Sequence, residues 1–491
     1  MAVLVPAYYW LENWLGRGML EKQEARFAAA GLSLEPADFL PEPGPPEENF
    51  GTTPLLDGMM HEDDDSSAGN AARAKREALS ALLPRRGKPA AGSKGKSAVP
   101  ENIPQISEGK PEWDKMRAWL EAYTVCKPPA DEPSDARAVF LALEAHHAVF
   151  AELVAAARRP RAVFTPSLRE RAQRLRNMHD LPGFVTTSIT LGRLLQLRAR
   201  AALACGEVPE ALAMLRVIWR LREASLGEAS LLSQLVANAY GGIWNGVARA
   251  MLATPGLTDE QCAALAATSG EWSTVEELEH TFRGETGLVL HFYHKNRAEM
   301  QRTEAWDVGG FRKAMLRFGP SGWVDQNMAT QLQRRMDYLL EPMRRGGLAA
   351  LPAAIAAEEA LNESSRERWM PSSFLLTHSG ESILLPLNIH RDFRVRLTLL
   401  GIAMERYRLK NGRYPATAAA LVPDFIASLP EDMDGAPFRA VTSADGAHCV
   451  LYSIGWNLTD DWHGVIPKSW SEKDENRSND WPLTLPILPP P

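Results

Sequence analysis

Cysteine is scarce in this sequence, and the few cysteines are scattered. Among 491 residues there are only four, Cys126, Cys205, Cys262 and Cys449. No pair of them has the spacing of a metal site, and their pattern does not resemble a disulfide framework. The cysteines therefore give no indication of a zinc-binding or disulfide-stapled fold, and they leave the redox compartment open.

Motifs of the common enzyme classes are also missing. The sequence contains no Gly-rich phosphate loop, no G-x-S-x-G elbow and no H-E-x-x-H helix. Two Glu-x-x-His pairs do occur, Glu144 with His147 and Glu277 with His280, and this spacing places both side chains of a pair on one helix face. Ferritin-like di-metal sites use two such pairs with two further carboxylates. A metal-dependent enzyme is therefore one hypothesis, and solvated polar helix faces are the plainer interpretation.

The charges show little bias toward either sign. The chain carries 54 basic and 61 acidic residues, a formal net charge of −7, so no nucleic-acid partner is expected. Positive charge is concentrated between Arg73 and Lys96, where Glu77 is the one acid. This stretch is either a basic arm or a solvated insertion. The second interpretation is favoured because no aromatic residues interleave its charges, as single-strand binders require.

A hydrophobic run long enough to span a bilayer is lacking at the N-terminus. Residues 2–11 are uncharged and include Tyr8, Tyr9 and Trp10, but Glu12 interrupts the run, and a spanning helix needs about 20 apolar residues. The aromatic residues followed by Arg17 are typical of the interfacial end of a spanning helix. We expect residues 1–18 to be either the remnant of a membrane anchor or a short helix packed on the body.

The rest of the chain divides by composition into four parts. Residues 19–60 predict a helix and a Pro-rich extended segment, and residues 61–111 predict a low-complexity disordered linker. Residues 112–375 have helical periodicity throughout, most regularly in 188–224, where Gly206 separates two helices as in a single tetratricopeptide hairpin. No second copy follows at a fixed period, so an irregular array of antiparallel helix hairpins is expected.

Residues 386–491 predict a small α+β module. Asn388 is expected to cap a helix that ends at Asn411-Gly412, and short strands are expected at 438–441 and 449–453, followed by an irregular tail. The fold class is therefore mainly α, with this module at the C-terminal end.

The module resembles the major pseudopilin of type II secretion. The similar segments are Met404–Pro415, with the sequence MERYRLKNGRYP, and Leu451–Gly455, with the sequence LYSIG. The whole chain also resembles an uncharacterised family of bacterial envelope proteins, in the segments Leu231–Val236 and Phe282–Glu285. That second resemblance implies a membrane helix, a helical domain and this module, located in the cell envelope, anchored in the inner membrane and facing the periplasm. The alternative is that the chain as written is soluble.

The pseudopilin resemblance also implies a calcium site after the last predicted strand. Its oxygen ligands would be Asn457, Asp460, Asp461 and Asp480. The loop Gly455-Trp456-Asn457 departs from the glycine-rich loop of pseudopilins, and the module's helix is internal and rich in arginine, so filament assembly is not expected.

These observations lead to one main functional hypothesis and two alternatives. The main hypothesis is a non-enzymatic scaffold of the envelope that binds an unidentified protein partner and contacts the membrane through its N-terminus. The alternatives are a metal-dependent enzyme that uses the Glu-x-x-His pairs, and a calcium-stabilised, secretion-related protein similar to a pseudopilin.

Overall fold

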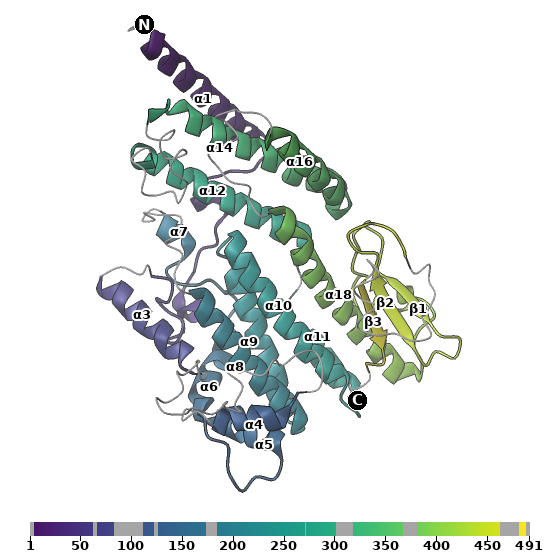
Figure 1. The fold of residues 1–491 in the computed structure, drawn as a ribbon. Helices are drawn as coiled ribbons and strands as arrows, with labels where there is room; N and C mark the ends of the chain where they lie inside the picture. Colours follow the sequence, from purple (N-terminus) through teal and green to yellow (C-terminus); the bar gives the residue numbers. More distant parts are fainter. Residues whose placement is uncertain are drawn as a thin grey trace, which may run out of the picture.

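The computed structural model describes residues 4–61, 66–82, 111–121, 126–172, 184–270, 272–300, 318–366, 381–461 and 481–487. It is mainly helical, and a three-stranded antiparallel sheet lies near the C-terminal end (Figure 1). The predicted mainly helical fold with a small sheet at its end is therefore confirmed.

The first third of the chain forms the long helix α1 and a series of shorter helices, of which α3 to α6 contribute to the first hydrophobic core. Their bounds are α1 Leu4–Ala29, α2 Pro36–Phe39, η1 Pro46–Glu48, η2 Phe50–Thr52, α3 Ser67–Ser80, α4 Trp113–Glu121, α5 Asp135–Ala142, η3 Leu143–His146, α6 His147–Ala156 and α7 Leu168–Ala172. Within the described residues, the stretch Asp135–Ala156 is the one helical segment that is long and apolar enough to cross a membrane, and 44% of its apolar window is buried. A core helix gives the same signal.

Longer helices follow. Their bounds are α8 Phe184–Ala204, α9 Val208–Leu226, α10 Leu231–Leu252, α11 Asp259–Ala266, α12 Thr274–Met300, α14 Gly322–Arg335, η4 Met336–Leu340, α15 Glu341–Gly346, η5 Gly347–Ala350, α16 Leu351–Arg366 and α18 Glu381–Asn411. The predicted hairpin is confirmed, because α8 and α9 pack together across Gly206, whose positive φ of 78° suits glycine. Buried side chains of α8, α9 and α10 form most of the first core.

A second core joins the N-terminal helix to the C-terminal module. It contains buried residues of α1, α12, α14, α18 and the sheet. Helix α18 belongs to both cores, since Val395 and Ile402 lie in the first while Phe393 and Leu397 lie in the second. The module is thus packed on the helical body along the length of α18 (Figure 1).

The C-terminal module differs from its prediction in two details. The sheet has the order β1-β2-β3, with η6 Ala418–Leu421 preceding it and strands Arg439–Thr442, Cys449–Ser453 and Trp481–Leu485. The third strand was not expected, because residues 481–485 pair with β2 across a long connection. Helix α18 starts at Glu381, before Asn388, so Asn388 is not its cap; its buried amide oxygen instead accepts a hydrogen bond from Asn238 of α10.

Residues 67–80 form helix α3, although the sequence predicted a disordered linker there. The prediction was wrong for this segment because its helix has a buried face that includes Ala72 and Leu79. The Arg76 guanidinium on the same face is also buried and donates to the carbonyl oxygens of Met59 and His61. The basic residues from Arg85 to Lys96 lie outside the described residues.

Candidate functional site

The structure describes three of the four residues of the predicted calcium site, Asn457, Asp460 and Asp461. The Asn457 side-chain nitrogen donates to Asp461 Oδ2 at 3.2 Å, and the Tyr452 hydroxyl donates to both carboxylate oxygens of Asp460 at 3.3 Å. Asp480 lies outside the described residues. Across the described part of the chain, no three His, Cys, Asp or Glu side chains form a group that could hold a metal ion. The calcium site therefore stays a prediction.

The two Glu-x-x-His pairs do not come together as a metal site. Glu144 pairs with Arg198 and lies 3.5 Å from His147 Nδ1. Glu277 instead accepts two hydrogen bonds from Arg222, at 2.9 and 2.7 Å. These carboxylates therefore serve separate ion pairs, and the di-metal hypothesis finds no site among them.

Cys126 and His146 form a contact that the sequence analysis missed. Cys126 Sγ lies 3.0 Å from His146 Nε2, and that nitrogen is also 2.7 Å from the Leu82 carbonyl oxygen. Because a carbonyl oxygen only accepts, Nε2 carries the hydrogen and is not a base for the thiol. Burial raises the pKa of Cys126 to about 11. The pair is therefore a packed polar contact rather than an activated nucleophile.

The neutral state of His146 predicts a pH dependence of stability. Burial lowers the pKa of His146 below its ordinary value of 6.5, and burial also lowers that of His280. Because these pKa values are lower in the folded state, the unfolded chain takes up protons on the two histidines at a higher pH than the folded chain does. The free energy of unfolding should therefore fall progressively as the pH is lowered below 6.5. Urea unfolding of the wild type and His146→Gln at neutral and acidic pH measures this.

The His146→Gln variant should lose less stability on acidification than the wild type. Substituting His147, whose side chain is 73% exposed, provides the matched control. His147→Gln should keep the wild-type pH profile. Equal profiles for all three proteins would contradict the assignment.

A buried polar cluster joins α9, the start of α12 and α18. The Arg222 guanidinium pairs with Glu277, lies 3.7 Å from Asp392 Oδ1, and is within 4.8 and 5.3 Å of the ring centres of Trp219 and Trp272. The side chain of Arg222 is 4% exposed and that of Asp392 is 6% exposed. These opposite charges are thus removed from water together, which is favourable only when each is paired.

Asp392 fixes three side chains at the edge of this cluster. Its carboxylate accepts hydrogen bonds from the Trp272 indole N–H and the Thr274 hydroxyl, each at 2.5 Å, and from Arg396 Nε at 2.9 Å. Arg396 also donates to the Trp272 carbonyl oxygen at 3.1 Å. Trp272 and Arg396 are therefore held in one arrangement at the surface.

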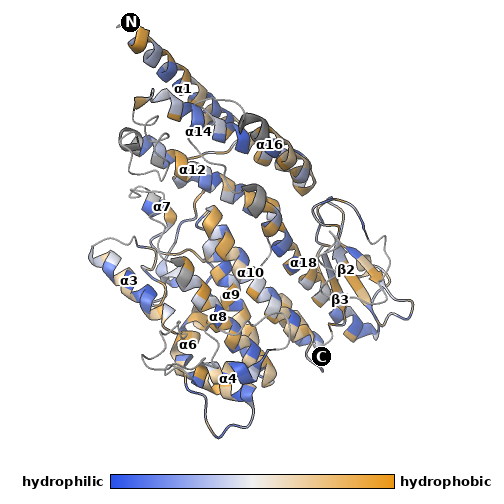
Figure 2. Cartoon of the chain, viewed as in Figure 1, coloured by the Kyte–Doolittle hydropathy of each residue, from blue (hydrophilic) through white to orange (hydrophobic). Residues whose placement is uncertain are grey.

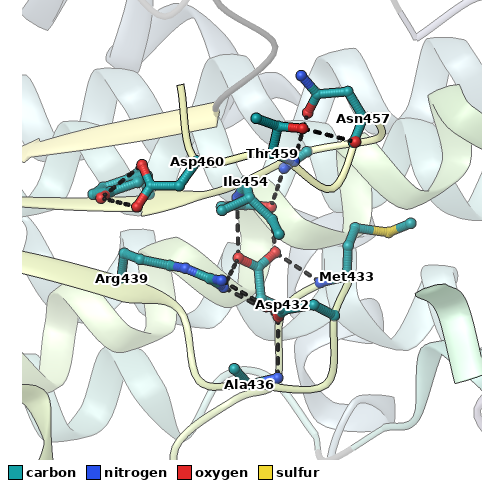
Figure 3. Close-up of polar contacts among 12 residues, drawn as sticks. Asp432, Met433, Ala436, Arg439, Ile454, Asn457, Thr459 and Asp460 are labelled. Atoms are coloured by element: carbon teal, nitrogen blue, oxygen red, sulfur yellow. Dashed lines mark hydrogen bonds and ion pairs between the residues drawn. The ribbon is translucent and has the colours of Figure 1, made fainter. Parts of the chain in front are cut away.

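A second buried carboxylate organises the turn that precedes β1 (Figure 3). Asp432 accepts hydrogen bonds from the Ser453 hydroxyl, from the backbone N–H groups of Ile454 and Met433, and from Arg439 at 2.7 Å. Burial raises the pKa of the Asp432 carboxyl, while these donors act to lower it. The sequence analysis did not identify this carboxylate, because the partners of Asp432 lie up to 22 residues away.

A groove of about 330 Å³ lies between these two organised regions. The lining comes from the start of α12 and the α15–η5 connection on one side and from residues 428–435 of the module on the other, and Arg396 lines the groove beside Trp272. The lining residues include Trp272, Ser273, Leu348, Arg396, Ser428 and Leu429. This volume is at the lower end of the range typical of ligand-binding clefts, about 300–1,000 Å³.

Comparisons with known proteins found no relative. No family model, no curated protein and no solved structure matches the chain. The resemblance to the pseudopilin and to the envelope family therefore stays a prediction, and the functional argument rests on the residues themselves.

Proposed function

We propose that the protein is a scaffold of the bacterial envelope, rather than an enzyme, and that it binds a protein partner in the groove between its helical body and its C-terminal module. The observation that supports this proposal most is the pairing of Trp272 with Arg396 on the groove wall. Tryptophan and arginine are enriched among the residues that dominate binding energy at protein interfaces.

The groove is suited to binding because its groups are already ordered. Trp272 and Arg396 share the carboxylate of Asp392, so neither side chain has to be immobilised when a partner binds. On the opposite wall, Ser428 and Leu429 precede the turn that Asp432 anchors to the end of β2. A partner segment would therefore meet two preformed walls, with polar and apolar contacts on each.

Site-specific photo-crosslinking in the native host tests the proposal. A benzophenone amino acid is placed at Ser428, an exposed residue of the groove, and in a second protein at Ala155, an exposed residue of α6 outside the groove. We expect a discrete crosslinked protein from position 428 and not from 155. Adding Arg396→Gln should weaken the adduct at 428, because the guanidinium lines the groove. Identical adducts from both positions, or none from 428, would count against a groove partner.

A further inference from the structure

The first half of α1 exposes large apolar side chains. Leu4 is 70% exposed, Val5 60%, Trp10 68% and Trp14 62%. Others on the same helix also exceed 40% exposure, namely Tyr8, Leu11, Leu15 and Met19. In Figure 2 the tip of α1 at the N-terminus is orange, and hydrophobic and hydrophilic residues alternate along the turns that follow. Contiguous apolar exposure of this kind marks an interaction surface.

The apolar surface covers more than one stripe of the helix. At 3.6 residues per turn, the eight exposed side chains spread over more than half of the circumference, opposite the packed face that contains Gly16 and Leu20. When a helix binds in a groove of a protein partner, the groove contacts one apolar face of the helix, formed by positions i, i+3, i+4 and i+7. An apolar surface this wide is better matched by a lipid phase, which surrounds a helix from several sides.

Helix α1 is fixed to α14 by close backbone contact and hydrogen bonds. A Cβ atom on Gly16 would lie 2.2 Å from the carbonyl oxygen of Gly322, so the two backbones are in direct contact. Asn13 Oδ1 accepts hydrogen bonds from the Gly322 N–H at 2.7 Å and the Ser321 hydroxyl at 2.9 Å. Farther along, Arg26 pairs with Asp337 at 2.6 Å. The N-terminal end of α1, which precedes these contacts, projects from the body (Figure 1).

Phe318 extends the surface from a second segment. Its side chain is 69% exposed, and its carbonyl oxygen accepts a hydrogen bond from the Tyr9 hydroxyl of α1. Aromatic side chains next to an exposed cation, here Trp14 near Arg17, are typical of the membrane interface.

We infer that the exposed apolar side chains of α1 between Leu4 and Leu15, together with Phe318, insert into the interfacial layer of a lipid bilayer and attach the rigid body to it. The inference rests on the envelope location proposed above and goes beyond it by assigning the lipid-contacting residues. Because the contact is apolar, binding does not require anionic lipid and responds little to salt.

Co-sedimentation of the full chain with phosphatidylcholine vesicles tests this inference. We expect the wild type to bind. The double variant Trp10→Gln/Trp14→Gln should bind at least about tenfold more weakly, which corresponds to a loss of about 1.4 kcal/mol of binding free energy. Leu361→Gln is the matched control, because Leu361 is 40% exposed on α16, and it should bind as the wild type does. Raising NaCl to about 0.5 M should leave binding nearly unchanged.

Two results would overturn the inference. One is a wild-type protein that stays in the supernatant, and the other is a double tryptophan variant that sediments like the wild type. Light scattering tests whether a second copy of the chain covers this surface instead. If the wild type is a dimer that does not bind vesicles, and the double variant is a monomer, the surface is a dimer interface. The crosslink from Ser428 is measured on the same variants, so failure of the lipid contact is distinguishable from failure of the groove proposal.

Discussion

Replacing Arg222 with methionine is expected to lower the free energy of unfolding by about 3–5 kcal/mol, the usual cost of leaving a buried charge without its partner. The guanidinium makes two hydrogen bonds to Glu277 and lies beside Asp392. Methionine fills a similar volume beside the two tryptophan rings but leaves the buried carboxyl group of Glu277 without these hydrogen bonds. Urea unfolding followed by far-UV circular dichroism measures the loss.

Two further variants separate the charge effect from a general effect of losing arginine. Arg345→Met removes an arginine whose side chain is 78% exposed and which pairs with Glu341 on the surface. That variant should lose less than about 1 kcal/mol. Arg222→Met/Glu277→Gln removes both partners and should recover part of the loss, because an amide is less costly to bury than a carboxylate. If Arg222→Met and Arg345→Met were equally stable, the buried cluster would not carry the stability assigned to it.

Much of the fold was predictable because it is determined by local sequence patterns. Gly206 separates α8 from α9, and the Asn411-Gly412 pair ends α18, as predicted from helix-stop chemistry that acts within a few residues. Helical periodicity works in the same way, since each apolar residue marks a face of its own helix. Strand β2 also matches its predicted bounds, 449–453.

The parts that sequence reasoning missed depend on contacts between distant segments. Strand β3 exists because Trp481–Leu485 pairs with β2, and its own sequence contains Pro482, which argues against a strand. Arg222 and Glu277 are 55 residues apart, so the spacing of Glu277 to His280 suggested a metal pair that the ion pair replaces. The groove walls likewise come from residues 272–275, 346–348 and 428–435, and no local pattern connects them.

Replacing Asp432 with asparagine is expected to lower the free energy of unfolding by about 2–4 kcal/mol, the sum of weakened bonds to a buried charged acceptor. The amide turns one acceptor oxygen into an N–H₂ donor that faces other donors, among them the Ile454 N–H at 3.0 Å. It also leaves Arg439 without one of its two carboxylate partners. Equilibrium urea unfolding of the full chain measures the change.

The neighbouring carboxylate supplies the matched control. Glu431 is exposed beside Asp432, and Glu431→Gln should change stability by less than about 0.5 kcal/mol. Since Asp432 ties the 428–435 wall of the groove to Ser453 at the end of β2, Asp432→Asn should also weaken the crosslink from Ser428, under conditions where the variant is still folded. Wild-type stability together with a wild-type crosslink would show that the buried carboxylate neither holds the module together nor shapes the groove. A stability loss with an unchanged crosslink would confine its role to the fold.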